Sequence, residues 1–309
     1  LITFIKIMSK WNYSIFYTTE LYDIYGNSLF KNRNEIDDKL IENIIHLFTA
    51  PDSEIIISST SLIDDIASIM KSASYKMIFS NEKNFEDIIS ILETIHIKNS
   101  IFEELQNIKE IMPSTYFHTL IVAALCLKMA QDFKSEDYNP DLIAGIGLVH
   151  DLGKSRIPLE ILEKPTPLTE TEFKVIQTHP LIEYILLSYY WRSQDSFIAN
   201  TAFSHHERLD GSGYPRGIKT LNKYVQLLTI CDIFDALISL RPYRNEPYSI
   251  RAALDLLLQE ADKGKLNKQF VLCLLSYVRQ DKPDFRNLKI SAENRDTPPK
   301  INYYGVRAA

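Results

Sequence analysis

Residues 149–154, Val-His-Asp-Leu-Gly-Lys, combine side chains that can bind metal and phosphate. The adjacent His150 and Asp151 offer two metal ligands, and Lys154 follows three residues later as a cation for a phosphate group. The chain has only seven His, and five of them fall into short motifs in and around this segment. These five are His118, His150, His179, His205 and His206.

With Asp151 and Asp232, these His form a set of candidate ligands that is larger than one ion needs. Neutral imidazole and carboxylate are ligands that borderline divalent metals bind. Two ions that share a bridging carboxylate would use the whole set, and Asp151 is the natural bridge because it adjoins His150. Such a pair lowers the pKa of a bound water and neutralises phosphoryl oxygens. The pattern therefore favours metal-assisted hydrolysis of a phosphodiester or phosphomonoester.

Two Arg residues, Arg241 and Arg244, offer further phosphate donors, because guanidinium groups bind phosphate through two hydrogen bonds at once. Each feature alone also has an ordinary interpretation. A His-His pair can lie on a surface, Asp232 and Asp235 can cap a helix or pair with Arg, and the two Arg can form a solvated helix end. Only the ordered occurrence of all these motifs along one span supports the joint interpretation.

Composition restricts the class of protein. The 309 residues are 45% hydrophobic and 24% charged, as in globular proteins, and the net charge of −6 argues against a surface that coats nucleic acid. Cys126, Cys231 and Cys273 are odd in number and widely spaced, so we expect buried thiols in a reducing compartment. We expect no membrane span, because no apolar run approaches the roughly 20 residues required. Residues 1–8 lack a secretory cleavage site, and we therefore expect a cytoplasmic protein.

Residues 1–92 show a mixed pattern, and we predict a small α/β N-terminal module with a regulatory or interaction role. β-Branched and aromatic runs at 13–17 and 54–58 predict strands, and apolar spacing over 34–48 predicts a helix. Gly26-Asn27 predicts a hairpin turn. The module contains no catalytic cluster: His46 and His96 lie on helical patterns without partner ligands.

Residues 93–309 read as a second, helical domain. Asn139-Pro140 is a favourable helix start, and that helix should present His150 and Asp151 in its last turn. Residues 169–172 form a capping-box sequence, and we predict that the helix they start ends at His179, before Pro180. Further helices are predicted into His205, over 224–240 and after Ser249, and residues 210–215 form a turn-rich loop.

Residues 116 to about 260 resemble an HD-GYP domain, the branch of the HD phosphohydrolase superfamily that acts on cyclic di-GMP. The resemblance implies a mainly α fold: an all-helical HD-type bundle with metals in its core, here preceded by the small α/β module. The matching motifs are His118, residues 150–154, Ile157-Pro158, Ile161-Leu162, Lys164-Pro165, Leu168-Thr169, residues 178–180, 205–208, 210–215, 232–237 and 241–244.

The resemblance also implies roles for individual residues. The first metal would take His118, His150, Asp151 and Asp232. The second would take Asp151, His179, His205 and His206. Asp151 and Lys154 would be catalytic, and the contacts to substrate would come from Lys154, Arg208, Tyr214, Arg241 and Arg244.

Two divalent transition-metal ions are expected, iron above all, with manganese as the alternative. Some relatives hold a third metal through a Glu one turn before the first His, but here that position is Ser114. The implied reaction is hydrolysis of cyclic di-GMP, or a related cyclic dinucleotide, to pGpG or GMP by a hydroxide on the binuclear centre. The alternative is an inactive module that keeps its metals and binds a partner, such as a GGDEF diguanylate cyclase domain, through the loop at Tyr214.

Overall fold

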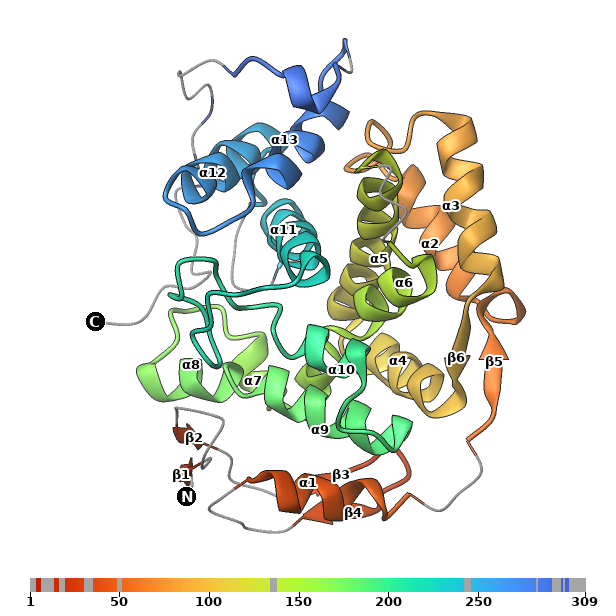
Figure 1. Cartoon of the computed structure of the whole chain (residues 1–309), viewed down its shortest axis with the longest axis vertical. Coiled ribbons are helices and arrows are strands. Elements are labelled where there is room, and N and C mark those ends of the chain that lie inside the picture. Colours follow the sequence, from red (N-terminus) through yellow and green to blue (C-terminus); the bar gives the residue numbers. More distant parts are fainter. Residues whose placement is uncertain are drawn as a thin grey trace.

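The computed structural model describes residues 4–6, 14–16, 20–30, 36–48, 52–133, 138–241, 246–281, 283–290, 296 and 298–299. Within these ranges the protein is mainly helical, with three short two-stranded sheets at its N-terminal side (Figure 1). The predicted fold class, a helical bundle preceded by smaller α/β elements, is confirmed. None of the helices in the described ranges is long and apolar enough to cross a membrane.

The three sheets are antiparallel hairpins or strand pairs. The predicted turn at Gly26 joins the second pair, and Gly26 has a φ of 81°, a conformation that glycine adopts without a steric penalty. The third pair joins residues 54–56 to residues 96–98, so it connects the two sides of the predicted division at residue 92. The strands are β1 (Phe4–Lys6), β2 (Ser14–Phe16), β3 (Leu21–Tyr22), β4 (Ser28–Phe30), β5 (Glu54–Ile56) and β6 (His96–Lys98).

Two predictions for this region need correction. The strand predicted over 54–58 ends at Ile56, and a 3-10 helix, η1 (Ile57–Ser59), follows, with Ile57 buried in the core. His96 lies in β6, where its backbone pairs with Ile56, and not on a helix. The helices before β6 are α1 (Asp38–Ile45), α2 (Leu62–Lys71) and α3 (Glu82–Thr94).

Helix α5 is the centre of the body, and it lies between α11 on one side and α2 with α3 on the other (Figure 1). Nearly all its side chains from Thr115 to Ala130 are buried. Buried apolar residues form one continuous core that runs from Leu21 to Phe285. The remaining helices are α4 (Asn99–Ile111), α5 (Pro113–Phe133), α6 (Pro140–Val149), α7 (Leu159–Leu162), α8 (Glu170–Ile176), α9 (His179–Trp191), α10 (Phe197–Ala202), α11 (Lys223–Ile238), α12 (Ile250–Asp262) and α13 (Lys268–Tyr277), with 3-10 helices η2 (Leu152–Arg156) and η3 (Phe285–Asn287).

Helix starts follow the predicted capping chemistry. The side chain of Asn139 accepts hydrogen bonds from the first turn of α6, with Pro140 at the opening position. The capping box of Thr169 and Glu172 is present at α8. The predicted end of this helix is wrong: α8 ends at Ile176, and His179 is the first residue of α9. Pro180 therefore opens a helix, since a proline lacks only an N–H that the first turn leaves unpaired anyway.

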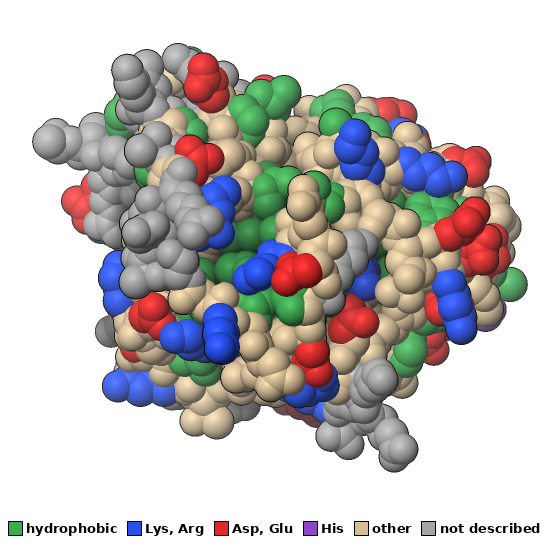
Figure 2. Space-filling model, turned by 90° about the horizontal axis from the view of Figure 1, so that it is seen from above, with side chains coloured by type: hydrophobic (Ala, Val, Ile, Leu, Met, Phe, Trp, Pro, Cys, Tyr) green, Lys and Arg blue, Asp and Glu red, His purple; other side chains and the backbone are tan. Residues whose placement is uncertain are grey.

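Charged side chains of both signs are interspersed on the face that Figure 2 shows, and no broad patch of one sign appears among its coloured residues.

Candidate metal centre

Five chain segments deliver the candidate ligands to one buried place. His118 comes from the second turn of α5, and Asp232 comes from α11. His150 and Asp151 follow the end of α6. His179 opens α9, and His205 with His206 lies in the turn after α10. All seven side chains are buried.

Two glycines allow these segments to approach closely. A Cβ on Gly147 would lie 2.5 Å from the Cα of Ala123, so only glycine lets α6 pack this tightly on α5. A Cβ on Gly153 would lie 2.1 Å from the carbonyl oxygen of His179. Backbone contact at these two points sets His150 beside His118, and Asp151 beside His179.

The side chains form two clusters of three. In the first, Nε2 of His118 lies 3.1 Å from Oδ1 of Asp232 and 3.3 Å from Nε2 of His150. In the second, Nε2 of His179 lies 3.4 Å from Nε2 of His205 and 3.1 Å from Nε2 of His206.

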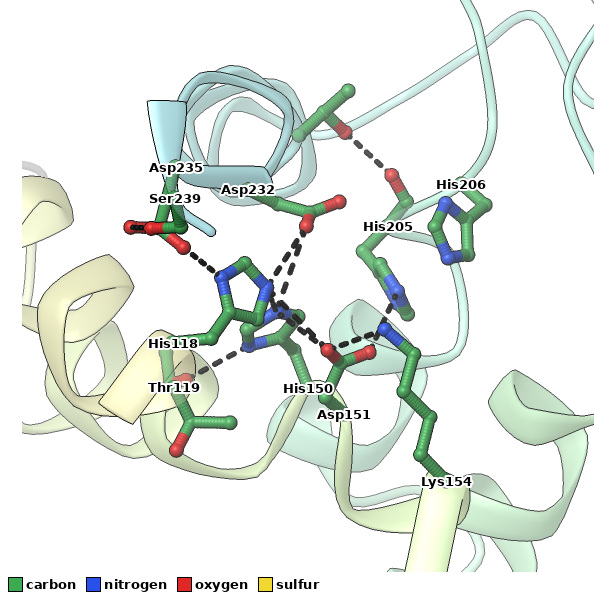
Figure 3. A network of polar contacts seen from close by, with 12 residues as sticks. His118, Thr119, His150, Asp151, Lys154, His205, His206, Asp232, Asp235 and Ser239 are labelled. Carbon is green, nitrogen blue, oxygen red and sulfur yellow. Dashed lines mark hydrogen bonds and ion pairs between the residues drawn. The ribbon is translucent and has the colours of Figure 1, made fainter. Parts of the chain in front are cut away.

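Asp151 lies between the two clusters, with His118 and His150 on one side and His205 and His206 on the other (Figure 3). Its Oδ2 lies 3.4 Å from Nε2 of His118, and its Oδ1 lies 3.6 Å from Nε2 of His179. Each carboxylate oxygen thus faces a different cluster. This is the position that a bridging ligand would occupy.

Hydrogen bonds at Nδ1 orient four of the imidazole rings. Nδ1 of His150, His179 and His205 each donates to the backbone carbonyl three residues earlier, at 2.8, 2.6 and 2.6 Å. Nδ1 of His118 lies 2.5 Å from Oδ2 of Asp235. A carbonyl or carboxylate partner places the proton on Nδ1, so Nε2 carries the lone pair that a metal requires.

The donor atoms fit divalent metal ions. Nitrogen lone pairs that approach one another at 3.1–3.4 Å cannot hydrogen bond to each other, but a shared cation accounts for their convergence. Two buried carboxylate oxygens, Oδ1 of Asp151 and Oδ2 of Asp232, have no hydrogen-bond partner, which is costly unless a cation satisfies them. Mixed imidazole and carboxylate donors suit borderline transition metals.

Burial controls the charge state of the His side chains. Burial lowers the pKa of His205, and it lowers the pKa of His150 to about 4. The pKa values of His179 and His206 are also held well below the usual value by burial. These four rings are therefore neutral at pH 7. For His118, burial is the largest single influence and favours the neutral ring, but the carboxylates of Asp235 and Asp232 together outweigh it and raise the pKa.

The two ligand carboxylates keep their charge. Burial opposes ionisation of Asp151, yet the nearby charge of Lys154 and the His rings hold its pKa well below the usual range. For Asp232, burial likewise raises the pKa, but the contact with His118 and the nearby His150 and His205 together outweigh burial and lower it. The metal-free site therefore offers ionised carboxylates together with four neutral imidazoles, those of His150, His179, His205 and His206.

Asp235 is a functional candidate that the sequence analysis considered only as a cap or an Arg partner. It lies one helical turn after Asp232 and hydrogen bonds to His118. Ser239 donates to its Oδ1 at 2.9 Å, and Arg241 donates to its Oδ2 at 3.4 Å. The spacing of three residues from Asp232 places both carboxylates on one face of α11, and this was the available signal.

A cavity of about 270 Å³ opens beside the second cluster, and His179 and His206 line it. Of the predicted substrate contacts, it is lined by Lys154, Arg208, Tyr214 and Arg241. Arg244 lies outside the residues that the structure describes. The apolar wall of the cavity comes from α7, α8 and the residues between them, with Ile161, Leu162, Leu168, Phe173 and Ile176.

The predicted phosphate contacts have partners within the protein. Nζ of Lys154 lies 2.6 Å from Oδ2 of Asp151, and Arg241 contacts Asp235. Arg208 donates to the carbonyl of Glu207 at 2.9 Å. The ring of Tyr214 stacks on the ring of His206, with centroids 4.6 Å apart, so its side chain is turned toward the site.

The loop that carries Tyr214 is held by the buried carboxylate of Glu207, which sequence reasoning did not assign to the site. Glu207 accepts hydrogen bonds from the backbone N–H groups of Arg216 at 2.7 Å and Ile218 at 3.2 Å. The other two His of the chain, His46 and His96, are exposed and lie outside both clusters.

Comparison with known proteins agrees with these features. A family model described as HD domain matches residues 89–269. The chain is 34% identical, over 54% of its length, to a 3'3'-cGAMP-specific phosphodiesterase of Vibrio cholerae. It is 45% identical, over 38% of its length, to a cyclic di-GMP phosphodiesterase response regulator of Xanthomonas campestris.

The match spans only 40% and 31% of the length of these two relatives. Among solved structures, a HDG"Y"P protein from Bdellovibrio bacteriovorus aligns with a TM-score of 0.44 and 18% identity, covering 76% of this chain and 71% of that one. The resemblance drawn from the sequence motifs is confirmed by the family model and the curated relatives: the chain belongs to the HD domain family.

Proposed function

We propose that this protein is a metal-dependent phosphodiesterase that hydrolyses cyclic di-GMP to pGpG, GMP or both. The observation that carries the proposal is Asp151, whose two carboxylate oxygens face two separate ligand clusters. A site for two neighbouring ions, beside a cavity that holds cationic side chains, is the arrangement that phosphodiester hydrolysis needs.

We propose two divalent ions per chain, iron in the first place and manganese as the alternative. Cluster one would comprise His118, His150 and Asp232, and cluster two His179, His205 and His206, with Asp151 shared. When bound, the ions would supply an acidified water as nucleophile and neutralise the charge that develops on the phosphoryl oxygens. Ser114, in place of a Glu, supports two ions instead of three.

The chain's own residues would bind and orient the dinucleotide. Lys154 is partly exposed to the cavity and lies against Asp151, so its ammonium group can hold a phosphate next to the clusters. Arg208 and Arg241 line the same cavity and can contact the second phosphate, with Arg244 proposed alongside them. The apolar wall of α7 and α8 would cover the flat face of a base and exclude water.

Three further proposals accompany this function. Residues 1–92 would be a regulatory or interaction module, and residues 93–309 the HD-GYP domain. A cytoplasmic location is supported by three buried thiols, Cys126, Cys231 and Cys273, none of which is in a disulfide. The alternative of an inactive, partner-binding module remains a prediction. Because Tyr214 stacks on His206, we assign its side chain to the substrate cavity, and a GGDEF-domain partner at its loop is also still a prediction.

The test is turnover by protein purified without oxygen, with its metal content measured on the same sample. Cyclic di-GMP, 3'3'-cGAMP and cyclic di-AMP are offered separately, and the products are identified by chromatography. We expect cyclic di-GMP to be opened, and Lys154→Ala to reduce turnover while metal content is retained. A folded protein with two ions per chain that leaves all three compounds intact would refute the function. Hydrolysis of 3'3'-cGAMP alone would move the assignment to that substrate.

A further inference from the structure

Tyr75 lies far from every motif of the metal site in the sequence, yet its hydroxyl group reaches that site. It is in the turn that follows α2, and only 3% of its surface is exposed. Its hydroxyl donates a hydrogen bond to Oδ1 of Asp235 in α11 and lies 3.2 Å from Oγ of Ser239. Helix α2, which precedes the turn, packs against α5, the helix that carries His118.

Asp235 transmits this contact to a candidate metal ligand. Its Oδ2 accepts from Nδ1 of His118, and Nε2 of the same ring points toward Asp232, His150 and Asp151. The orientation of His118 thus depends on where Asp235 holds its carboxylate. His150, His179 and His205 differ, because a carbonyl of their own turn orients each of them.

We propose that Tyr75 is a positioning residue of the metal centre: it fixes the carboxylate of Asp235, which holds His118 in the orientation that binds the first ion. The inference rests on the binuclear centre of the proposed function. It assigns a role in that centre to the N-terminal 92 residues, for which sequence analysis predicted no catalytic residue. Tyr75 itself is not catalytic, because it touches neither the cavity nor a ligand atom.

The expected size of the effect follows from the other donors around Asp235. Partners of ligating His typically change metal affinity by about 10- to 100-fold when they are removed. Ser239 and Arg241 still contact Asp235 when the Tyr75 hydroxyl is absent. We therefore expect Tyr75→Phe to lower the affinity for the first ion by about tenfold, at the lower end of that range. Asp235→Asn removes the charge beside His118 and should lower the affinity for the first ion more than Tyr75→Phe does.

The experiment is a titration of Mn²⁺ into the metal-free full-length protein, with free Mn²⁺ measured by electron paramagnetic resonance. Tyr189→Phe is the matched control. The Tyr189 hydroxyl also donates to a buried carboxylate of the N-terminal segment, Asp23 at 2.8 Å, but Asp23 contacts none of the candidate ligands in the described structure. Repeating the titrations in a His206→Ala background, which removes a ligand of the second cluster only, assigns the change to the first.

The double variant Tyr75→Phe/Asp235→Asn decides whether the two residues act in series. If Tyr75 works through Asp235, the double variant should bind Mn²⁺ no more weakly than Asp235→Asn alone. Unchanged affinity in Tyr75→Phe, an equal loss in Tyr189→Phe, or additive losses in the double variant would each overturn the inference. Metal affinity needs no substrate, so failure to hydrolyse cyclic di-GMP would refute the proposed function without touching this result.

Discussion

Replacing Asp151, the proposed bridge, by its neutral isostere is the most direct test of the metal centre. Asp151→Asn keeps the shape of the side chain but removes one negative charge between the clusters. The first cluster would retain one carboxylate, Asp232, whereas the second would retain three neutral imidazoles. Both ions should therefore bind more weakly, and the second should lose its anionic ligand altogether.

The magnitude can be worked from the contacts. The oxygens of Asp151 lie 3.4 and 3.6 Å from the nearest ligand nitrogens of the two clusters, so an ion among those nitrogens is within about 4 Å of the charge. Unit charges about 4 Å apart attract by roughly 4 kcal/mol at an effective dielectric constant of about 20, and the attraction of a divalent ion is larger. Each 1.4 kcal/mol is a factor of ten, so we expect each dissociation constant to rise by about a thousandfold or more.

The assay is metal analysis of anaerobically purified protein, followed by titration of Mn²⁺ into the metal-free form. His179→Ala is the comparison: it removes a ligand from the second cluster only and should empty mainly that site. Asp262→Asn, a charge change on the exposed surface, controls for net charge, and circular dichroism controls for folding. If Asp151→Asn and His179→Ala lose the same amount of metal while both stay folded, Asp151 is not a bridge.

Three further predictions concern stability and substrate. The metal-free protein should lose stability as the pH falls from 7 to 5. Four His side chains have folded pKa values below the usual 6.5 and therefore take up protons on unfolding: His150, His179, His205 and His206. Each of them changes the free energy of unfolding by up to about 1.4 kcal/mol per pH unit. His118 acts in the opposite direction because its folded pKa is raised, and its contribution to stability is lost as the pH rises through that pKa. Equal urea midpoints at pH 7.5 and 5.5 would contradict this. Gly153→Ala should destabilise the fold by about 1–3 kcal/mol, because the added Cβ would collide with the carbonyl oxygen of His179. An unchanged urea midpoint would show that the backbone can shift at this point without loss of stability. Arg208→Ala should weaken the binding of cyclic di-GMP by about tenfold or more, with both metals retained. Arg241→Ala should also weaken the binding of the first ion, because Arg241 contacts Asp235. If calorimetry finds the parental affinity for cyclic di-GMP in Arg208→Ala, that residue does not belong to the substrate site.

Residue type made much of the site predictable from sequence. His and Asp in short ordered motifs are visible without coordinates, and the structure brings all seven predicted ligands together. The role of Asp235 could have been inferred from its spacing to Asp232. Tyr75 gave no local signal, because its partner is 160 residues away and only packing of α2 on α5 brings them together. The end of α8 was misjudged because a proline is compatible with both the end of one helix and the start of the next.

The way the imidazole rings are anchored makes the two clusters unequal when the protein begins to unfold. In the second cluster, His179 and His205 are oriented by carbonyls of their own turns, so their geometry survives as long as those turns do. In the first, His118 is oriented by a side chain of α11, a separate helix. Loosening of α11 would therefore release the first ion while much of the second site is intact. Under gradual denaturation the ions should leave in a fixed order, the His118 site first.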